Sequence, residues 1–212
     1  FSAHVARALV LRSVTVTLAA STFEDCKALV GHSGGALLIE TSSTLTATSC
    51  TFRNNFADGD VASGGAIAVR SSSTLIASDV ICENNRATSV GGAVIIEESS
   101  TLTAQTCAFR NNSADGDAAS GGAIAVRSSS TLIASAVIYE NNRATSVGGA
   151  VIIEESSTLT ALTCVFRNNS ADGAAASGGA IAVRSSSTLI ASAVTCERNQ
   201  AAFGGCLDAA AS

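Results

Sequence analysis

The chain carries several groups that could do chemistry, and most of them recur along the sequence. Asp58 and Asp60 lie in an Ala-Asp-Gly-Asp segment that is repeated at Asp115 and Asp117, and Asp172 remains in a third copy. Such carboxylates could bind calcium or serve as the acid and base of a polysaccharide hydrolase or lyase. Calcium takes about six to eight oxygen ligands, more than one such loop offers, and glycine beside aspartate is typical of a turn. We therefore interpret these aspartates as turn residues.

The two histidines offer no better starting point for catalysis. Neither His4 nor His32 has a repeated acidic or thiol partner nearby, so no zinc site, no catalytic triad and no cofactor is predicted. An active site needs a unique set of side chains, whereas the acids here recur with each duplicated segment. We expect no enzymatic activity, and a polysaccharide lyase or hydrolase is the weakest of the alternatives.

The seven cysteines fall into two groups. Those inside the regular part of the chain are expected to be small buried hydrophobes, and they are Cys50, Cys82, Cys107 and Cys164. The geometry of a solenoid allows a disulfide only near the irregular ends, where Cys26, Cys196 and Cys206 lie.

An internal repeat must position all of these groups. A Gly-Gly pair begins at residues 34, 64, 91, 121, 148, 178 and 204, so the spacing alternates between 30 and 27 residues before a final 26. Residues 52–108 and 109–165 differ at only six of 57 positions. Each unit contains three short β-like stretches and no helical period, which predicts an all-β parallel β-helix of about seven coils.

The domain organisation follows from this repeat. We expect a single β-helix domain over residues 1–212, with an irregular first coil at 1–33, regular doublets at 34–203 and a terminal segment at 204–212. Because the chain opens on Phe1 and lacks methionine, we expect a processed piece or a subunit of a larger assembly. The hydrophobic fraction of 47% with only 4% aromatic residues indicates a narrow bore filled by small side chains.

Aligning the coils sorts side chains into columns with separate roles. A buried ladder of amides is predicted for Asn55, Asn85, Asn112, Asn142, Asn169 and Asn199. Charges alternate in sign along Glu40, Arg70, Glu97, Arg127, Glu154 and Arg184. A second alternating column holds Glu24, Arg53, Glu83, Arg110, Glu140, Arg167 and Glu197. Alternation turns the repulsion of stacked like charges into attraction, so both columns specify the register.

Two flat, weakly polar outer faces are expected, and each is a candidate contact surface. The first is formed by Thr44, Thr46, Thr74, Ile76, Thr101, Thr103, Thr131, Ile133, Thr158, Thr160, Thr188 and Ile190. The second is formed by Ala66, Ala93, Ala123, Ala150 and Ala180 beside Ala68, Ile95, Ala125, Ile152 and Ala182. The alternative is that these residues only reflect high β-propensity in a solenoid wall.

Composition limits the partners of such a surface. A net charge of −5 with one lysine leaves no basic patch, which argues against nucleic acid. No apolar run is long enough to span a membrane. A protein partner or self-association remains, with polysaccharide possible. Ice is an alternative, because ranks of Thr-x-Thr resemble the ice-binding faces of β-helical antifreeze proteins, although isoleucine replaces the second threonine on alternate coils.

Two recurring motifs resemble a known family. Gly-Gly-Ala-aliphatic occurs at 34–37, 64–67, 91–94, 121–124, 148–151 and 178–181, and Phe-x-x-Asn at 52–55, 109–112 and 166–169. Their alternation resembles the polymorphic outer membrane protein repeats of chlamydial autotransporter passengers, with related repeats in algal and protist proteins. The resemblance implies a right-handed β-helix displayed outside the cell or at its surface, and adhesion. The chain departs from it where Cys82, Tyr139 and Cys196 replace the phenylalanine.

Together these observations predict a non-enzymatic β-helical rod that acts as a structural or adhesive interaction module. Binding is expected through a flat Ala/Ile/Thr face or through an end coil.

Overall fold

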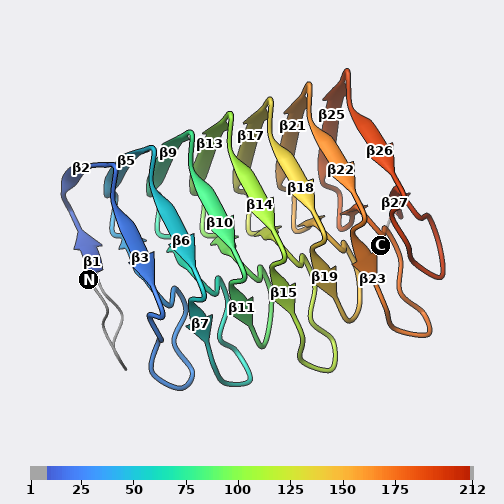
Figure 1. Cartoon of the computed structure of the whole chain (residues 1–212), viewed down its shortest axis with the longest axis horizontal. Helices are drawn as coiled ribbons and strands as arrows, with labels where there is room; N and C mark the ends of the chain where they lie inside the picture. Colours follow the sequence, from blue (N-terminus) through green and yellow to red (C-terminus); the bar gives the residue numbers. More distant parts are fainter. Residues whose placement is uncertain (1–8, 211–212) are drawn as a thin grey trace.

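The computed structural model describes residues 9–210, which wind into a parallel β-solenoid of about seven turns. All of the regular elements described are strands, and equivalent strands of successive coils stack along the long axis (Figure 1). The described part of the chain contains no helix that could cross a membrane. The predicted all-β solenoid is therefore confirmed.

The aliphatic sheet follows the Gly-Gly pairs and has eight strands. In stacking order they are β1 (Leu9–Arg12), β4 (Leu37–Glu40), β8 (Ile67–Val69), β12 (Val94–Ile96), β16 (Ile124–Val126), β20 (Val151–Ile153), β24 (Ile181–Val183) and β27 (Leu207–Ala209).

The threonine sheet comes next in each coil and has the longest strands. They are β2 (Thr15–Ala19), β5 (Thr44–Thr48), β9 (Thr74–Ser78), β13 (Thr101–Gln105), β17 (Thr131–Ser135), β21 (Thr158–Leu162) and β25 (Thr188–Ser192).

The aromatic sheet closes the third side of the bore. Its strands are β3 (Thr22–Glu24), β6 (Thr51–Arg53), β10 (Ile81–Glu83), β14 (Ala108–Arg110), β18 (Ile138–Glu140), β22 (Val165–Arg167) and β26 (Thr195–Glu197).

A fourth sheet was not expected, because the sequence indicated only three stretches per coil. Its two-residue strands are β7 (Phe56–Ala57), β11 (Arg86–Ala87), β15 (Ser113–Ala114), β19 (Arg143–Ala144) and β23 (Ser170–Ala171). The alanine of each strand is buried, with Ala57 and Ala87 packed together in a small separate cluster. Two residues are too few for the alternating pattern that identifies a strand in a sequence.

The bore is filled by inward columns from the first three sheets. Leu45, Leu102 and Leu132 from the threonine sheet face aliphatic side chains such as Ile124 and Val151, all at most 1% exposed. From the aromatic sheet, the rings of Phe109 and Tyr139 stack at 5.3 Å between centroids, and those of Tyr139 and Phe166 at 4.5 Å. Because the bore is so narrow, alanine and cysteine complete most of the remaining core.

The second expected outer face, of alanine and isoleucine, is not exposed. Ala66 and its equivalents belong to the core of the bore, and Ala68, Ile95 and Ile152 are completely buried in a second cluster with Val90 and Val147. The segments between the short strands and the next aliphatic strand fold back over this face, where Val90 pairs with Ser120 and Val147 with Ser177. Strand alternation shows which side chains point out of the bore, but not whether a loop then covers them.

The Gly-Gly pair of each coil lets the chain turn tightly from the return segment into the next aliphatic strand. The pair Gly121–Gly122 shows how. Gly121 has φ +65°, a left-handed conformation that costs glycine little. Gly122 needs space instead, because a Cβ there would lie 2.2 Å from the carbonyl oxygen of Gly149 and 2.5 Å from that of Arg143. The two glycines therefore serve different requirements of the same turn.

The buried hydroxyl of Tyr139 leads to a prediction about stability. Among the described residues, the Tyr139 hydroxyl oxygen has no hydrogen-bond partner, and burial raises the pKa of Tyr139 well above its ordinary value. Phenylalanine occupies the equivalent position in the adjacent strand on either side, at Phe109 and Phe166. Tyr139→Phe should therefore raise the free energy of unfolding by about 1–2 kcal/mol, because an unsatisfied buried hydroxyl is removed.

Equilibrium unfolding in urea measures this difference. The reverse change Phe166→Tyr is the matched control and should lower stability. A less stable Tyr139→Phe variant would show that the hydroxyl has a favourable contact in solution.

Candidate functional site

The threonine–isoleucine face is the outer surface of the threonine sheet, and its side chains lie in two columns. The first column holds threonine in all seven strands, since Thr15 extends the six predicted positions Thr44, Thr74, Thr101, Thr131, Thr158 and Thr188. The second column reads Thr17, Thr46, Ile76, Thr103, Ile133, Thr160 and Ile190. The predicted face thus forms one continuous surface.

The isoleucines of the second column are large, exposed apolar groups, and Leu162 at the end of its strand is exposed to the same extent as Ile133. Ile76 is 39% exposed, Ile133 38% and Ile190 53%. Ile76 and Ile133 each lie between two threonines of the neighbouring strands, and Ile190, in the last strand of the sheet, lies beside Thr160. Large and small side chains therefore alternate along the second column from Thr46 onward. The face therefore has a relief with a period of two coils, or about 9.6 Å at the usual strand spacing.

The same face carries no charge. A third outward column ends the strands with Ala19, Thr48, Ser78, Gln105, Ser135, Leu162 and Ser192. None of the three outward columns of the seven strands contains an ionisable side chain. An uncharged surface of this extent is unusual for a solvent-exposed sheet, which ordinarily carries lysine and glutamate.

A serine ladder, which was not anticipated, aligns the beginning of each threonine strand. In each coil the serine hydroxyl oxygen accepts a hydrogen bond of 3.1–3.2 Å from the backbone N–H of the equivalent residue in the preceding coil. The serines are Ser43, Ser73, Ser100, Ser130, Ser157 and Ser187. The signal in the sequence is the constant serine directly before Thr-Leu. This ladder fixes the register in which the threonine ranks are presented.

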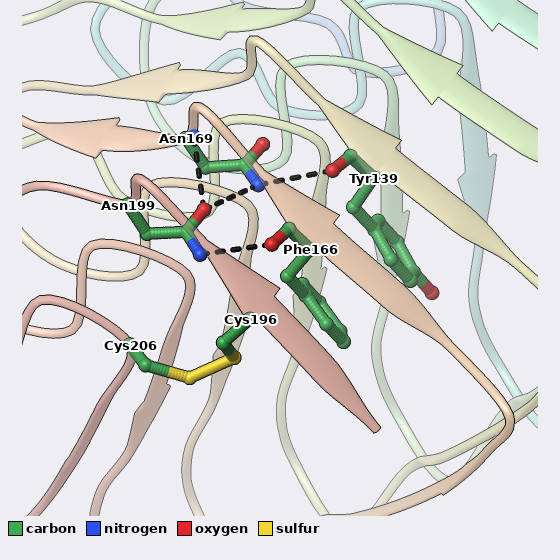
Figure 2. Close-up of a disulfide and its surroundings, with 6 residues drawn as sticks. All are labelled: Tyr139, Phe166, Asn169, Cys196, Asn199 and Cys206. Carbon is green, nitrogen blue, oxygen red and sulfur yellow. Dashed lines mark hydrogen bonds between the residues drawn. A yellow bond between two sulfur atoms is a disulfide. The ribbon is translucent and has the colours of Figure 1, made fainter. Parts of the chain in front are cut away.

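The predicted asparagines form an amide ladder at the end of the aromatic strands. The Oδ1 of Asn142 accepts 3.0 Å hydrogen bonds from the backbone N–H and the Nδ2 of Asn112. Its Nδ2 donates to the carbonyl oxygen of Phe109 at 2.9 Å and to Oδ1 of Asn169 at 3.0 Å. Figure 2 shows the continuation of this pattern through Asn169 and Asn199. The ladder satisfies backbone groups that would otherwise be buried without partners.

The residue before each of the first five ladder asparagines is also an asparagine, with a role in the turn that the sequence did not indicate. Asn54, Asn84, Asn111, Asn141 and Asn168 all have φ between 53° and 56° and are exposed. Asparagine tolerates this left-handed conformation better than most residues. The Asn-Asn dipeptide therefore combines a turn residue with a ladder residue.

The first charged column forms only some of its expected pairs. Arg12 and Arg70 both contact the carboxylate of Glu40, and Arg127 contacts Glu97 at 2.7 Å. Burial raises the pKa of Glu40, but hydrogen bonds from the two guanidinium groups outweigh it and hold that pKa below its ordinary value. The column therefore acts as separate clusters rather than as a continuous ladder.

Glu154 departs from the predicted alternation. Within residues 9–210 it makes no ion pair within 4 Å, because Arg127 turns to Glu97 and Arg184 to Asp208. Burial raises the pKa of Glu154, and the charge of Glu155 raises it further. In the second column Arg53 pairs with Glu24, while Arg110 and Arg167 both approach Glu140.

Three of the five loop aspartates have cationic partners. Asp58 accepts from Nζ of Lys27 at 3.1 Å, and the carboxylates of Asp115 and Asp172 pair with Arg86 and Arg143. Asp60 and Asp117 line a surface depression of about 450 Å³ together with Thr88. Among the described residues no three histidine, cysteine or acidic side chains gather where they could hold a metal ion. His4 lies outside the described residues.

One disulfide joins the aromatic and aliphatic walls near the last coil. Cys196 and Cys206 are bonded, with a Cα–Cα distance of 6.0 Å (Figure 2). The other five cysteines are free and buried, including Cys26, and burial raises the pKa of the Cys82, Cys107 and Cys164 thiols. The free thiols therefore behave as core residues.

Comparison with known proteins identifies the architecture rather than an activity. No curated protein and no solved structure matches the chain. The family model described as right handed beta helix region matches residues 8–201. This match covers nearly all of the coils described above, and the chain belongs to the right-handed β-helix family.

Proposed function

We propose that this chain is a non-enzymatic structural and adhesive interaction module that binds through the threonine–isoleucine face. The observation that carries the proposal is the absence of charge from the three outward columns of the seven threonine strands. On the other walls, arginine and acidic side chains recur in almost every coil. This segregation favours a surface that is covered in use.

A second copy of the chain is the partner that best fits the relief of this face. The exposed isoleucines alternate with shorter threonines, so an identical face can place its isoleucines over those threonines. An uncharged face also brings no like charges together when two copies meet.

The size of the face sets the strength of this contact. Seven strands about 4.8 Å apart and five residues of about 3.3 Å each give roughly 550 Å² per copy. A standard interface buries about 800 Å² per partner, so the contact should be weak and reversible, and would be strengthened by repeated units.

The location that agrees with this function is outside the cell or at its surface. The resemblance to autotransporter repeats favours surface display. The Cys196–Cys206 disulfide supports the same location, because disulfides persist mainly in oxidising compartments.

The proposal predicts that charge on this face abolishes association. Ile76→Lys combined with Ile133→Lys should eliminate self-association, because two lysines would be desolvated against an uncharged surface. Sedimentation equilibrium across a concentration series measures the effect, and the β-sheet circular dichroism signal should stay unchanged.

Val61→Lys with Ala118→Lys is the matched control, since both residues are exposed in loops away from this face and the added charge is the same. That control should associate as the parent does. Unchanged association of the Ile76/Ile133 variant, or an equal loss in both variants, contradicts the proposed face.

The unbroken threonine column specifically favours ice as a second candidate ligand. The replacements Ile76→Thr, Ile133→Thr and Ile190→Thr would complete a second threonine column. These replacements should weaken binding between copies, which uses the isoleucines, and strengthen ice binding, which uses regular threonine ranks. Thermal hysteresis of the purified protein distinguishes ice binding from binding between copies. Its absence in both the parent chain and this variant excludes ice as a ligand.

A further inference from the structure

Five coils present an exposed asparagine at one corner of the solenoid, between the aromatic and short strands. These turn residues are Asn54, Asn84, Asn111, Asn141 and Asn168, and each precedes a buried ladder asparagine. Their side chains take no part in the ladder, whose hydrogen bonds all come from the following residue. A bulky group attached to one of them would therefore project into solvent without disturbing the core.

Only two of these five asparagines are followed by serine at the second position. Ser113 follows Asn111, and Ser170 follows Asn168, whereas Phe56, Arg86 and Arg143 occupy the equivalent positions of the other coils. Asn-x-Ser is the acceptor sequence for N-linked glycans when x is not proline. The fold thus contains two acceptor sequences and three matched sites that lack only the hydroxyl.

We propose that Asn111 and Asn168 are N-glycosylation sites. The buried neighbours Asn112 and Asn169 are excluded on two grounds, because both are completely inaccessible and both have alanine at the second position. A modification at the exposed asparagines keeps every hydrogen bond of the amide ladder.

The donor required is an oligosaccharide linked to a lipid diphosphate, delivered by an oligosaccharyltransferase. Nδ2 of Asn111 forms a bond to the anomeric carbon of the sugar. The bond from that carbon to the diphosphate oxygen breaks with its electron pair, the lipid diphosphate leaves, and the amide nitrogen loses one proton to a base. No oxidant or reductant is consumed.

One observation supports this modification, and a second determines when it takes place. The Cys196–Cys206 disulfide indicates passage through an oxidising compartment, such as the secretory pathway in which N-glycans are attached. Ser113 is half-buried and paired with Arg86 and Arg143 in the short sheet, so transfer must precede closure of that coil.

The glycans would also be separated from the threonine–isoleucine face. Asn111 follows β14 and precedes β15, so the aromatic sheet lies between it and the threonine strand β13 (Figure 1). The two sites lie two coils apart on the same corner, which leaves the uncharged face free for contact.

The test is the full chain produced as a secreted protein in glycosylating eukaryotic cells. Intact mass should show two glycans, and release by peptide N-glycosidase in ¹⁸O-water should convert Asn111 and Asn168 into labelled aspartates. Ser113→Ala and Ser170→Ala should each remove one glycan and leave the circular dichroism spectrum unchanged.

A gain of modification provides the sharper control. Arg143→Ser supplies the missing hydroxyl two residues after Asn141 and should add a third glycan, at the expense only of an exposed ion pair with Asp172. Protein that stays inside the cells is treated with peptide N-glycosidase in the same way, and the loss of glycans is detected as a shift in gel mobility. Formation of the disulfide shows that the parent chain entered the secretory pathway. If Asn111 and Asn168 are unmodified in such protein, the proposal is overturned.

Discussion

Gly122→Ala is expected to lower the free energy of unfolding by more than about 4 kcal/mol, an exceptionally large effect for a single added methyl group. The added Cβ would lie 2.2 Å from the carbonyl oxygen of Gly149 and 2.5 Å from that of Arg143. Both contacts are with backbone atoms of the following coil, so no side chain can rotate away, and the coil of Gly122 must separate from the next one. Because each coil contacts only its neighbours, a break near the middle of the stack divides the solenoid into two weaker halves.

Urea unfolding and thermal unfolding, followed by circular dichroism, measure this loss. Gly31→Ala is the matched control, because its Cβ would meet nothing within 4 Å although φ is +79°. The control should lose only about 1–2 kcal/mol, the usual penalty of a left-handed non-glycine residue. A loss at Gly122 no larger than that at Gly31 would contradict close packing between coils as the reason for this glycine.

The register of the solenoid could be read from the sequence because one residue type recurs at each structural position. Asn85 and Asn112 align in the sequence at the repeat spacing and lie one above the other in the structure. A stacked coil forces chemically equivalent positions to meet, so periodicity in the chain becomes contact in space. The threonine ranks were predictable for the same reason.

The surface was harder to predict, because it depends on loops and on choices between competing partners. Ile95 alternates outward in its strand but is completely buried, since the return segment covers it. Arg127 has acidic neighbours at Glu97 and Glu154 and contacts only Glu97. Alternating charge in a column defines which pairs can form, whereas side-chain geometry decides which of them do.

The threonine–isoleucine face and the acceptor asparagines divide the outside of the rod by chemistry. One wall is uncharged, and the corner beyond the next sheet carries Asn111 and Asn168 in exposed turns. If both proposals hold, glycans would limit contact on their side and leave a single wall for association. The order of the repeat would then determine which side of the rod can bind.

Asn142→Ala should lower the free energy of unfolding by about 4–6 kcal/mol, because four hydrogen bonds of its side chain are lost and the groups left behind are buried. The Asn112 backbone N–H and the Phe109 carbonyl oxygen would each lose a partner. A cooperative urea transition, with the midpoint and slope compared to those of the parent, gives the loss.

Two further variants test whether hydrogen-bond direction, rather than packing, explains this cost. Asn141→Gly changes the adjacent exposed residue, whose left-handed φ of 54° glycine accepts, and should alter stability by less than about 0.5 kcal/mol. Asn142→Asp keeps the shape but, when ionised, cannot donate to Phe109 or Asn169. Its carboxyl group faces these acceptors, so its folded pKa should rise above the unfolded value, and the variant should lose stability relative to the parent as pH increases through that folded pKa. If the difference in free energy of unfolding between Asn142→Asp and the parent does not change with pH, the direction of the hydrogen bonds does not explain the stability that the ladder provides.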